Sequence, residues 1–380
     1  MYDYMNKEII KNMKKHGLNL SKYACKDNDA YRFNDSNEDY RTSFFKDIDK
    51  ILYSLSYTRY IDKTQVFSNN ENDMISKRMT HVQMVSKIAR TIGRALNLNE
   101  DLIEAASLGH DLGHVPYGHV GESILNEISL KHNEGYFAHN IQSVRTLMNI
   151  ENQGDGNNIT VQVLDAIFCH NGEILEGKYE PTKKSKEQFL KEYNDSYKNK
   201  ELLKKVKPMT LEGCVVRISD IVGYIGKDID DAIRLGLIKE KEIPINIIKI
   251  LGKTNSDIVN IIVTDIINNS YDKNYIKLSK DIFEALQDLI KFNYENIYNK
   301  ANSKEQIEKY KKMFNSLFDL YLDQVENNKK ENDIFTLFLD TMNENYINNT
   351  SNARKVIDYI AGMTDDFFNN QYKKYFKCVK

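Results

Sequence analysis

The sequence predicts an all-α protein with a helical core and a C-terminal helical extension. Apolar residues recur at intervals of three and four through most of the chain, which is the spacing of one helix face. The 380 residues include four prolines, so few positions interrupt a helix. No alternation of apolar and polar residues, the pattern of a half-buried strand, reaches comparable length.

Composition argues against several classes of protein. With 41% apolar residues, a chain of this length can bury a substantial core. The formal net charge of −2 shows no basic excess, so a nucleic-acid partner is not indicated, although local basic patches stay open. The four cysteines form no C-x-x-C pair, which argues against a disulfide framework or a zinc ribbon and fits a reducing, cytoplasmic location. No stretch approaches about 18 uninterrupted apolar residues, so we expect no membrane partner.

Two predicted helices follow each other closely in the first third of the chain. The shorter of them begins near Asn99, whose side chain can cap the first turn ahead of Asp101. It ends around Gly113, before Pro116. The longer helix, which precedes it, carries an apolar stripe through Val85, Ile88, Ala89, Ile92, Ala95 and Leu96.

The strongest single helix pattern runs over residues 211–225. Its apolar positions lie within about 120° of the helix circumference; they are Leu211, Cys214, Val215, Ile218, Ile221, Val222 and Ile225. On the opposite side, a stripe spanning about 80° holds Asp220, Tyr224, Asp228 and Asp231. On this helix alone, the pattern favours an ordinary amphipathic helix with a solvated acidic side.

Residues 178–207 carry ten lysines and few large apolar side chains. The segment follows Gly172 and Gly177, which interrupt regular structure. We interpret it as an exposed, solvated insertion, because charge runs are usually solvated. Contact with polyphosphate or nucleic acid is the alternative.

Histidines cluster in one part of the chain, since seven of the eight lie between residues 81 and 170. The adjacent His110 and Asp111 supply one imidazole nitrogen and one carboxylate oxygen. That pair suits a borderline or hard divalent ion better than a soft metal. His81 and Asp220 are candidates for further ligands, because each lies on or beside a strongly periodic helix.

In order and spacing, His81, His110-Asp111 and Asp220 resemble the H…HD…D metal motif of the HD-domain phosphohydrolases. Further segments are similar to the dGTPase-like branch of that family, the deoxynucleoside triphosphate triphosphohydrolases. Because they follow the family's order over roughly residues 40 to 370, chance is a poor explanation. They are residues 41–44, 63–67, 78–81, 108–114, 121–122, 137–140, 170–173, 217–232 and 358–365.

The resemblance implies three regions. Residues 1–40 form an N-terminal segment. Residues 41–235 form the HD-domain metallophosphohydrolase core, which contains the Lys-rich insertion at about 178–207. Residues 236–380 form a C-terminal helical region that completes the pocket and supplies the interfaces of a homo-oligomer.

The resemblance also implies an activity. The expected reaction is hydrolysis of a deoxynucleoside triphosphate (dNTP), either dGTP or several dNTPs, to the deoxynucleoside and inorganic triphosphate. One divalent metal per active site, Mn²⁺, Mg²⁺ or Fe²⁺, is expected on His81, His110, Asp111 and Asp220. The resemblance leaves open whether a second nucleotide acts as an allosteric activator.

The expected catalytic residues follow directly in the chain. His119 and Glu122 are three residues apart, so they share a face if the segment after Gly118 is helical. In the family such a pair is catalytic, which implies that His119 moves a proton at the phosphate ester while Glu122 fixes its tautomer. His114 is expected to contact phosphate or the leaving oxygen, with the positioning of a metal ligand as the alternative.

Five residues are expected to bind substrate. Arg78 lies three residues before His81, where its guanidinium can bind phosphate; a structural salt bridge is the alternative. The resemblance adds His139 near the triphosphate. It also adds Gln65, Tyr224 and Asp228 at the deoxyribose.

Two departures from the family pattern concern substrate choice. Ile221 stands where some relatives have a lysine, and Tyr57-Thr58-Arg59-Tyr60 stands where the family has an arginine pair. Two alternative functions therefore remain. One is an HD phosphohydrolase for another nucleotide phosphoester, and the other is a nucleotide-sensing protein with little turnover.

Overall fold

The computed structural model describes residues 19–36, 40–67, 74–170 and 174–376. The first 18 residues of the predicted N-terminal segment lie outside the described part. The helices up to residue 235 are α2 (Ser43–Leu52), α3 (Leu55–Thr58), α4 (Arg78–Ala95), α5 (Glu100–Gly109), α6 (Gly118–Lys131), α7 (His139–Arg145), α8 (Val161–Phe168), α9 (Lys186–Ser196), α10 (Lys200–Leu203) and α11 (Leu211–Arg234).

The C-terminal region is also helical, which confirms the all-α prediction. Within the described residues, the strands are limited to β1 (Lys178–Tyr179) and β2 (Ile276–Lys277), an antiparallel pair with Lys178 opposite Lys277. The remaining helices are α12 (Ile245–Leu251), α13 (Asn255–Ser270), α14 (Lys280–Asn293), α15 (Asn299–Ala301), α16 (Lys304–Glu326), α17 (Asp333–Thr336), α18 (Glu344–Asn349), α19 (Asn352–Ala361) and α20 (Asp365–Phe376).

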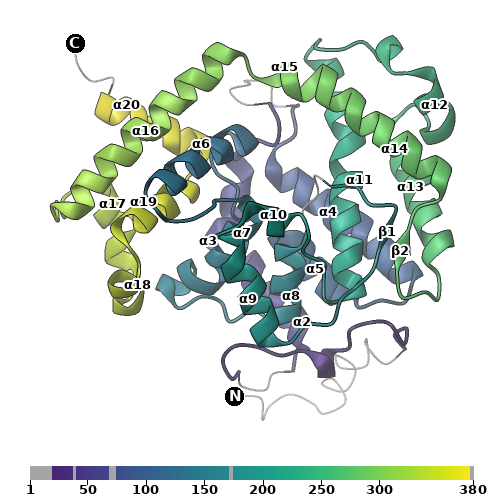
Figure 1. Cartoon of the computed structure of the whole chain (residues 1–380), viewed down its shortest axis with the longest axis horizontal. Coiled ribbons are helices and arrows are strands. Elements are labelled where there is room, and N and C mark those ends of the chain that lie inside the picture. Colours follow the sequence, from purple (N-terminus) through teal and green to yellow (C-terminus); the bar gives the residue numbers. More distant parts are fainter. Residues whose placement is uncertain (1–18, 37–39, 68–73, 171–173, 377–380) are drawn as a thin grey trace.

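Helices α4, α5 and α11 pack against one another in the middle of the molecule (Figure 1). Their predicted apolar stripes are buried, as Val85 on α4 and Ile218 on α11 illustrate. The side chain of Asn99 accepts hydrogen bonds from the backbone N–H groups of Asp101 and Leu102, which confirms the predicted cap of α5. Helix α5 ends at Gly109 rather than near Gly113, because the chain turns directly after it.

The solvated acidic side that the pattern of α11 favoured when taken alone is not observed, because its carboxylates are buried. Asp220, Asp228 and Asp231 are 8%, 3% and 2% exposed. Helices α13 and α14 and the π-helical turn η7 (Tyr294–Tyr298) pack against α11 beside α4, so the helix is covered on more than its apolar face. Ile221 is also fully buried.

The C-terminal region divides between two hydrophobic cores. Helices α12 to α14 contribute to the core that contains α4, α5 and α11. Helices α16 to α20 form a second core with α6, on the opposite side of the molecule (Figure 1). The chain between α14 and α16, which includes η7 and α15, crosses from one core to the other.

The Lys-rich segment differs from the solvated insertion that the sequence predicted. It forms α9 and α10, and Phe189 and Tyr193 of α9 are buried in the main core. Lys184 is also buried, where its ammonium donates a 2.8 Å hydrogen bond to Asp165. Most of the other lysines are exposed, so the segment packs on its apolar face and keeps a basic outer face.

None of the helices in the described ranges is both long and apolar enough to span a membrane. Cys25, Cys169 and Cys214 carry free thiols. Cys378 lies outside the described residues.

Candidate active site

Four side chains from three parts of the core converge at one point. His81 lies in the first turn of α4, His110 and Asp111 follow directly after α5, and Asp220 lies in the middle of α11. The Nε2 atom of His81 is 3.0 Å from Oδ1 of Asp220 and 3.8 Å from Oδ2 of Asp111. The Nε2 atom of His110 is 3.6 Å from Oδ1 of Asp220 and 3.5 Å from Oδ1 of Asp111.

The orientation of the His110 ring is set by the backbone of α5. Its Nδ1 atom lies 2.6 Å from the carbonyl oxygen of Ser107, which can only accept a hydrogen bond, so Nδ1 carries the hydrogen. Its Nε2 atom is buried and has no hydrogen-bond partner among the described residues. This nitrogen therefore presents a lone pair to the two carboxylates when the ring is neutral.

The electrostatics of this cluster favour a cation. Burial disfavours the imidazolium of His110, but Asp111 and Asp220 outweigh burial and raise its pKa to about 9. Despite burial, His110 and Arg78 hold the pKa of Asp111 well below its usual range. His110 and His81 likewise lower the pKa of Asp220. Both carboxylates are therefore ionised at neutral pH.

The donor set fits a divalent ion. Two imidazole nitrogens and two carboxylates suit a borderline or hard cation. One donor atom from each of His81, His110 and Asp111 lies within 4.8 Å of the others, and Asp220 forms such a group with His110 and His170. The backbone hydrogen bond of His110 is the kind of contact that orients a metal-bound imidazole.

A second group of ionisable side chains begins at the start of α6. The Nδ1 atom of His119 is 3.0 Å from Oε2 of Glu122, so the segment after Gly118 is helical and brings the pair together as predicted. Glu122 also accepts a 2.8 Å hydrogen bond from the backbone N–H of His139. Despite burial, His139 and His119 hold the pKa of Glu122 well below its usual range. Glu122 thus serves two histidines as a carboxylate.

His114 connects this group to the four-residue cluster. Its Nε2 atom lies 3.2 Å from Oδ1 of Asp111, and its ring stacks on that of His139 with centroids 4.0 Å apart. Burial, Arg78 and His139 hold the pKa of His114 well below its usual range, so the ring is neutral. This geometry matches the alternative in which His114 positions Asp111.

Arg78 is buried at the start of α4. Its Nη1 atom donates a hydrogen bond to Oδ2 of Asp111, and its Nη2 atom donates one of 3.1 Å to the carbonyl oxygen of Thr64. The Nε atom has no hydrogen-bond partner among the described residues. The salt bridge that was the alternative prediction is therefore present, and it holds the guanidinium at the cavity wall.

Most of these side chains line a cavity of about 300 Å³. Ten of the twelve predicted site residues line it, and the two others, His110 and Glu122, lie directly behind lining residues. From the predicted set, the lining residues are Gln65, Arg78, His81, Asp111, His114, His119, His139, Asp220, Tyr224 and Asp228.

Asp228 lies two turns after Asp220 and is covered by the C-terminal region. The hydroxyl of Tyr298 donates a 2.8 Å hydrogen bond to its Oδ2 atom. Burial raises the pKa of Asp228 to about 7, although this hydrogen bond opposes the shift. Tyr294, Tyr298, Ala301 and Asn302 line the cavity, so the segment between α14 and α16 forms part of its wall.

Two residues near the cavity were missed in the set of expected site residues. His170 is fully buried, and its Nε2 atom lies 3.0 Å from Nε2 of His139. The clustering of histidines between residues 81 and 170 is a sequence pattern that could have indicated His170. No local pattern indicates Tyr298, which is 70 residues from Asp228 in the chain.

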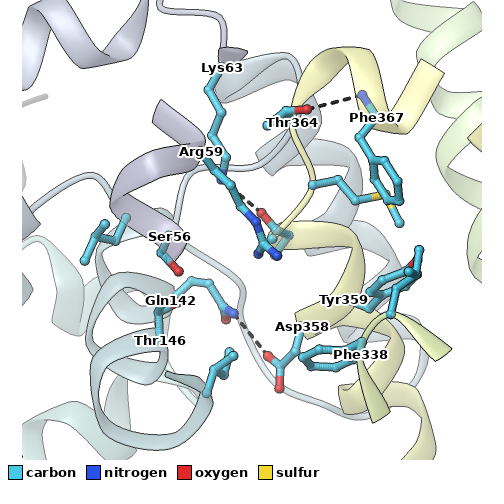
Figure 2. A pocket seen from close by; sticks show the side chains of 17 residues that line it. Ser56, Arg59, Lys63, Gln142, Thr146, Phe338, Asp358, Tyr359, Thr364 and Phe367 are labelled. Atoms are coloured by element: carbon cyan, nitrogen blue, oxygen red, sulfur yellow. Dashed lines mark hydrogen bonds between the residues drawn. The ribbon is translucent and has the colours of Figure 1, made fainter. Parts of the chain in front are cut away.

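A second cavity of about 410 Å³ lies beside Gly113, between α7 and the α19–α20 corner (Figure 2). Its lining includes Arg59, Lys63, Gln142 and Asp358. Lys63 is fully buried and donates hydrogen bonds to the carbonyl oxygens of His114 and Ala361. Burial and the nearby cations Arg59 and Arg78 lower the pKa of Lys63 to about 7. Through His114, Lys63 connects the walls of the two cavities.

Comparisons with known proteins agree with this arrangement. Residues 78–224 match the HD domain, and residues 276–374 match the phosphohydrolase-associated domain. The chain is 38% identical to a deoxyguanosinetriphosphate triphosphohydrolase-like protein of Caldanaerobacter subterraneus, over 94% of this chain and 92% of the relative. It is 36% identical to the protein of that description from Clostridium perfringens strain SM101, over 97% and 96% of the two chains.

A more distant relative of the same description, from Rickettsia conorii, is 30% identical over 88% of this chain and 91% of its own. The match to the HD domain begins at Arg78 and contains the complete His81, His110, Asp111 and Asp220 set. The chain therefore belongs to the dGTPase-like family of HD-domain phosphohydrolases.

Proposed function

We propose that this enzyme hydrolyses a deoxynucleoside triphosphate, dGTP or several dNTPs, to the deoxynucleoside and inorganic triphosphate. The observation that carries the proposal is the composition of one cavity. It is lined by His81, Asp111 and Asp220 of the His and Asp cluster, and by Tyr224 and Asp228 on the turns of α11 that follow Asp220. At 1.5 Å per residue, these turns lie about 6 and 12 Å beyond Asp220, a span that suits a sugar joined to a phosphate.

His81, His110, Asp111 and Asp220 are proposed to hold one divalent metal, Mn²⁺, Mg²⁺ or Fe²⁺. When bound, such an ion polarises a phosphoryl group and lowers the pKa of a coordinated water. His114 donates to Asp111 and fixes the carboxylate. The ionised state of Asp111 and Asp220 in the protein supports this assignment.

His119 is proposed to transfer a proton at the phosphate ester. The Glu122 carboxylate faces Nδ1 of His119, so that nitrogen keeps its hydrogen and Nε2 is the atom that accepts or gives a proton. Because Glu122 stays ionised, it also raises the basicity of the imidazole. The side chain of His119 is 58% exposed, which leaves it accessible to a substrate in the cavity.

Arg78, His139 and Gln65 are proposed to bind substrate around this centre. The Nε atom of Arg78 is a buried donor with no partner among the described residues, which suits a phosphate oxygen. The Oε1 atom of Gln65 is a buried acceptor that also has no hydrogen-bond partner among the described residues, which suits a sugar hydroxyl. His139 borders the cavity between the proton-transfer pair and His170.

Tyr224 and Asp228 are proposed to select the sugar. A carboxylate at position 228 can accept a hydrogen bond from the 3′-hydroxyl. The ring of Tyr224 occupies the wall where a 2′-hydroxyl would need space, so a ribonucleotide would leave a buried hydroxyl without a partner.

Product identity tests the proposal. Purified protein is incubated with each dNTP and NTP, alone and in pairs, with Mn²⁺ or Mg²⁺ in ¹⁸O-labelled water. The expected products are the deoxynucleoside and triphosphate that contains the label, because water attacks the α-phosphorus. Release of monophosphate or orthophosphate would support the alternative HD phosphohydrolase, and tight binding without release would support a nucleotide sensor. Stimulation in the paired incubations would reveal an activating nucleotide.

A further inference from the structure

The cavity of about 410 Å³ beside Gly113 is lined by two cations that form no ion pair within the described part of the chain. One is Arg59, whose guanidinium has no hydrogen-bond partner among the described residues and points into the cavity (Figure 2). The other is Lys63, whose ammonium has three hydrogens but donates to two acceptors, the carbonyl oxygens of His114 and Ala361. Each cation can therefore still donate to a ligand in the cavity.

The two charged groups are neighbours at the end of α19. The ammonium of Lys63 is 3.2 Å from the carbonyl oxygen of Ala361. A Cβ atom on the next residue, Gly362, would lie 2.8 Å from Nη1 of Arg59. Burial and the charge of Arg59 both lower the pKa of Lys63. Because Ala361 and Gly362 are adjacent in the chain, one anion can contact both cations.

The carboxylates around the cavity already have other partners. Asp358 lines the cavity, but both of its oxygens accept hydrogen bonds from Arg145, with 2.6 Å between Nη2 and Oδ2. Glu151 attracts Arg59 without pairing with it, while its Oε1 atom accepts hydrogen bonds from the hydroxyl and the backbone N–H of Ser56. The cavity thus keeps positive charge that no carboxylate neutralises, and such charge is costly where water is partly excluded.

The end of α19 is an alternative partner for the cations, because the last carbonyl groups of a helix carry a partial negative charge. This explains the position of Lys63, which donates to Ala361. It does not explain Arg59, which donates to none of the carbonyl groups in the described ranges. An anion in the cavity accounts for both side chains.

We propose that this cavity binds a phosphate group between Arg59 and Lys63. A guanidinium offers paired N–H donors that match two phosphate oxygens, and an ammonium adds a point charge. The lining also includes the rings of Phe338 and Phe367, so it suits the apolar part of a phosphate ester as well as free inorganic phosphate. Because Lys63 donates to the carbonyl oxygen of His114, a bound phosphate would be linked to the wall of the active site.

The experiment counts phosphate bound per chain on the metal-loaded protein. Equilibrium dialysis with radiolabelled inorganic phosphate detects every phosphate site, including any at the metal centre. Arg59→Gln is expected to bind one phosphate fewer per chain than wild-type protein. Arg94→Gln is the matched control, because it removes the same charge from an exposed ion pair with Glu100, and it should bind as many as wild type.

Competition with phenyl phosphate distinguishes the two sources of the phosphate group. Phenyl phosphate should displace the label from the site that Arg59→Gln loses. Displacement at a lower concentration than unlabelled inorganic phosphate requires would identify an ester with an apolar body as the ligand. Displacement at a higher concentration would identify the free anion.

Equal numbers of bound phosphate in folded Arg59→Gln and Arg94→Gln would overturn the proposal. Circular dichroism shows whether each variant is folded. Should Arg59→Gln not fold, Arg59→Lys decides, because it keeps the charge but lacks the paired donors: a higher Kd at one site supports the proposal, and an unchanged binding curve contradicts it. The dialysis contains no dNTP, so its result is independent of the proposed function.

Discussion

The hydroxyl of Tyr298 donates a 2.8 Å hydrogen bond to Oδ2 of Asp228 and thereby joins the C-terminal region to the central helix α11. Asp228 is buried on the wall of the cavity, and burial raises its pKa to about 7. Its protonation therefore changes in the neutral pH range. Both its contribution to stability and its ability to accept a sugar hydroxyl depend on that change.

Asp228→Asn should alter the pH dependence of stability. The pKa of Asp228 is higher in the folded protein than the ordinary value near 4, so the folded state keeps a proton that the unfolded state loses. The associated stabilisation is fully present below about pH 4 and is lost as pH rises to about 7. Relative to the Asn variant, wild-type protein should lose about 2 to 3 kcal/mol of unfolding free energy between pH 5 and pH 8. Urea unfolding of both metal-free proteins measures this difference, and an equal pH dependence in both would contradict the assignment.

Tyr224→Ala should narrow the preference for dNTP over the matching NTP in kcat/KM. Removing the ring opens space for the 2′-hydroxyl, and the affected discrimination is about 1 to 3 kcal/mol. Tyr224→Phe is the matched control, because it keeps the ring and should keep the ratio. Steady-state kinetics on folded variants decide the matter; an unchanged ratio in Tyr224→Ala would mean that the ring braces neighbouring helices instead.

His110→Ala or Asp111→Ala should remove the bound metal together with activity, because each deletes a proposed ligand. His119→Ala should keep its metal and lose about 10²-fold or more in kcat, as expected when a general acid or base is removed. Metal analysis beside kinetics distinguishes the two classes. A His119→Ala enzyme with near-normal kcat would rule out the proton-transfer role.

Gly113→Ala should destabilise the protein and disturb the site. A Cβ atom at this position would lie 2.3 Å from both the carbonyl oxygen of His139 and the backbone nitrogen of Ser143. Helix α7 would have to move away from the core, at a cost of about 3 kcal/mol. Gly177→Ala is the control, since its Cβ would meet Phe283 at an ordinary 3.7 Å. Thermal unfolding compares the two variants. Similar melting temperatures would contradict the prediction, because they would show that α7 can shift without loss of stability.

Local sequence features were sufficient to predict the helical class and the positions of the main helices. Periodicity located α4 and α11, and the Asn99 side chain marked the start of α5. These features are local, because a helix repeats every 3.6 residues and its caps lie within one turn of its end. The family motif likewise named residues that the structure brings into one cavity.

The surroundings of each of those residues depend on packing between elements that are distant in the chain. A polar helix face looks the same in sequence whether water or another helix covers it. For this reason the helical pattern alone favoured a solvated acidic side on α11, whose carboxylates are in fact buried, and only the family motif indicated a site there. The Lys-rich segment was misjudged for the same reason, since apolar residues between its lysines, among them Phe189 and Tyr193 of α9, are buried in the main core. Only packing between distant segments sets the contact of His139 with His170, 31 residues away, and that of Asp228 with Tyr298, 70 residues away. No local pattern specifies which distant residues meet, because that depends on how all the helices pack together.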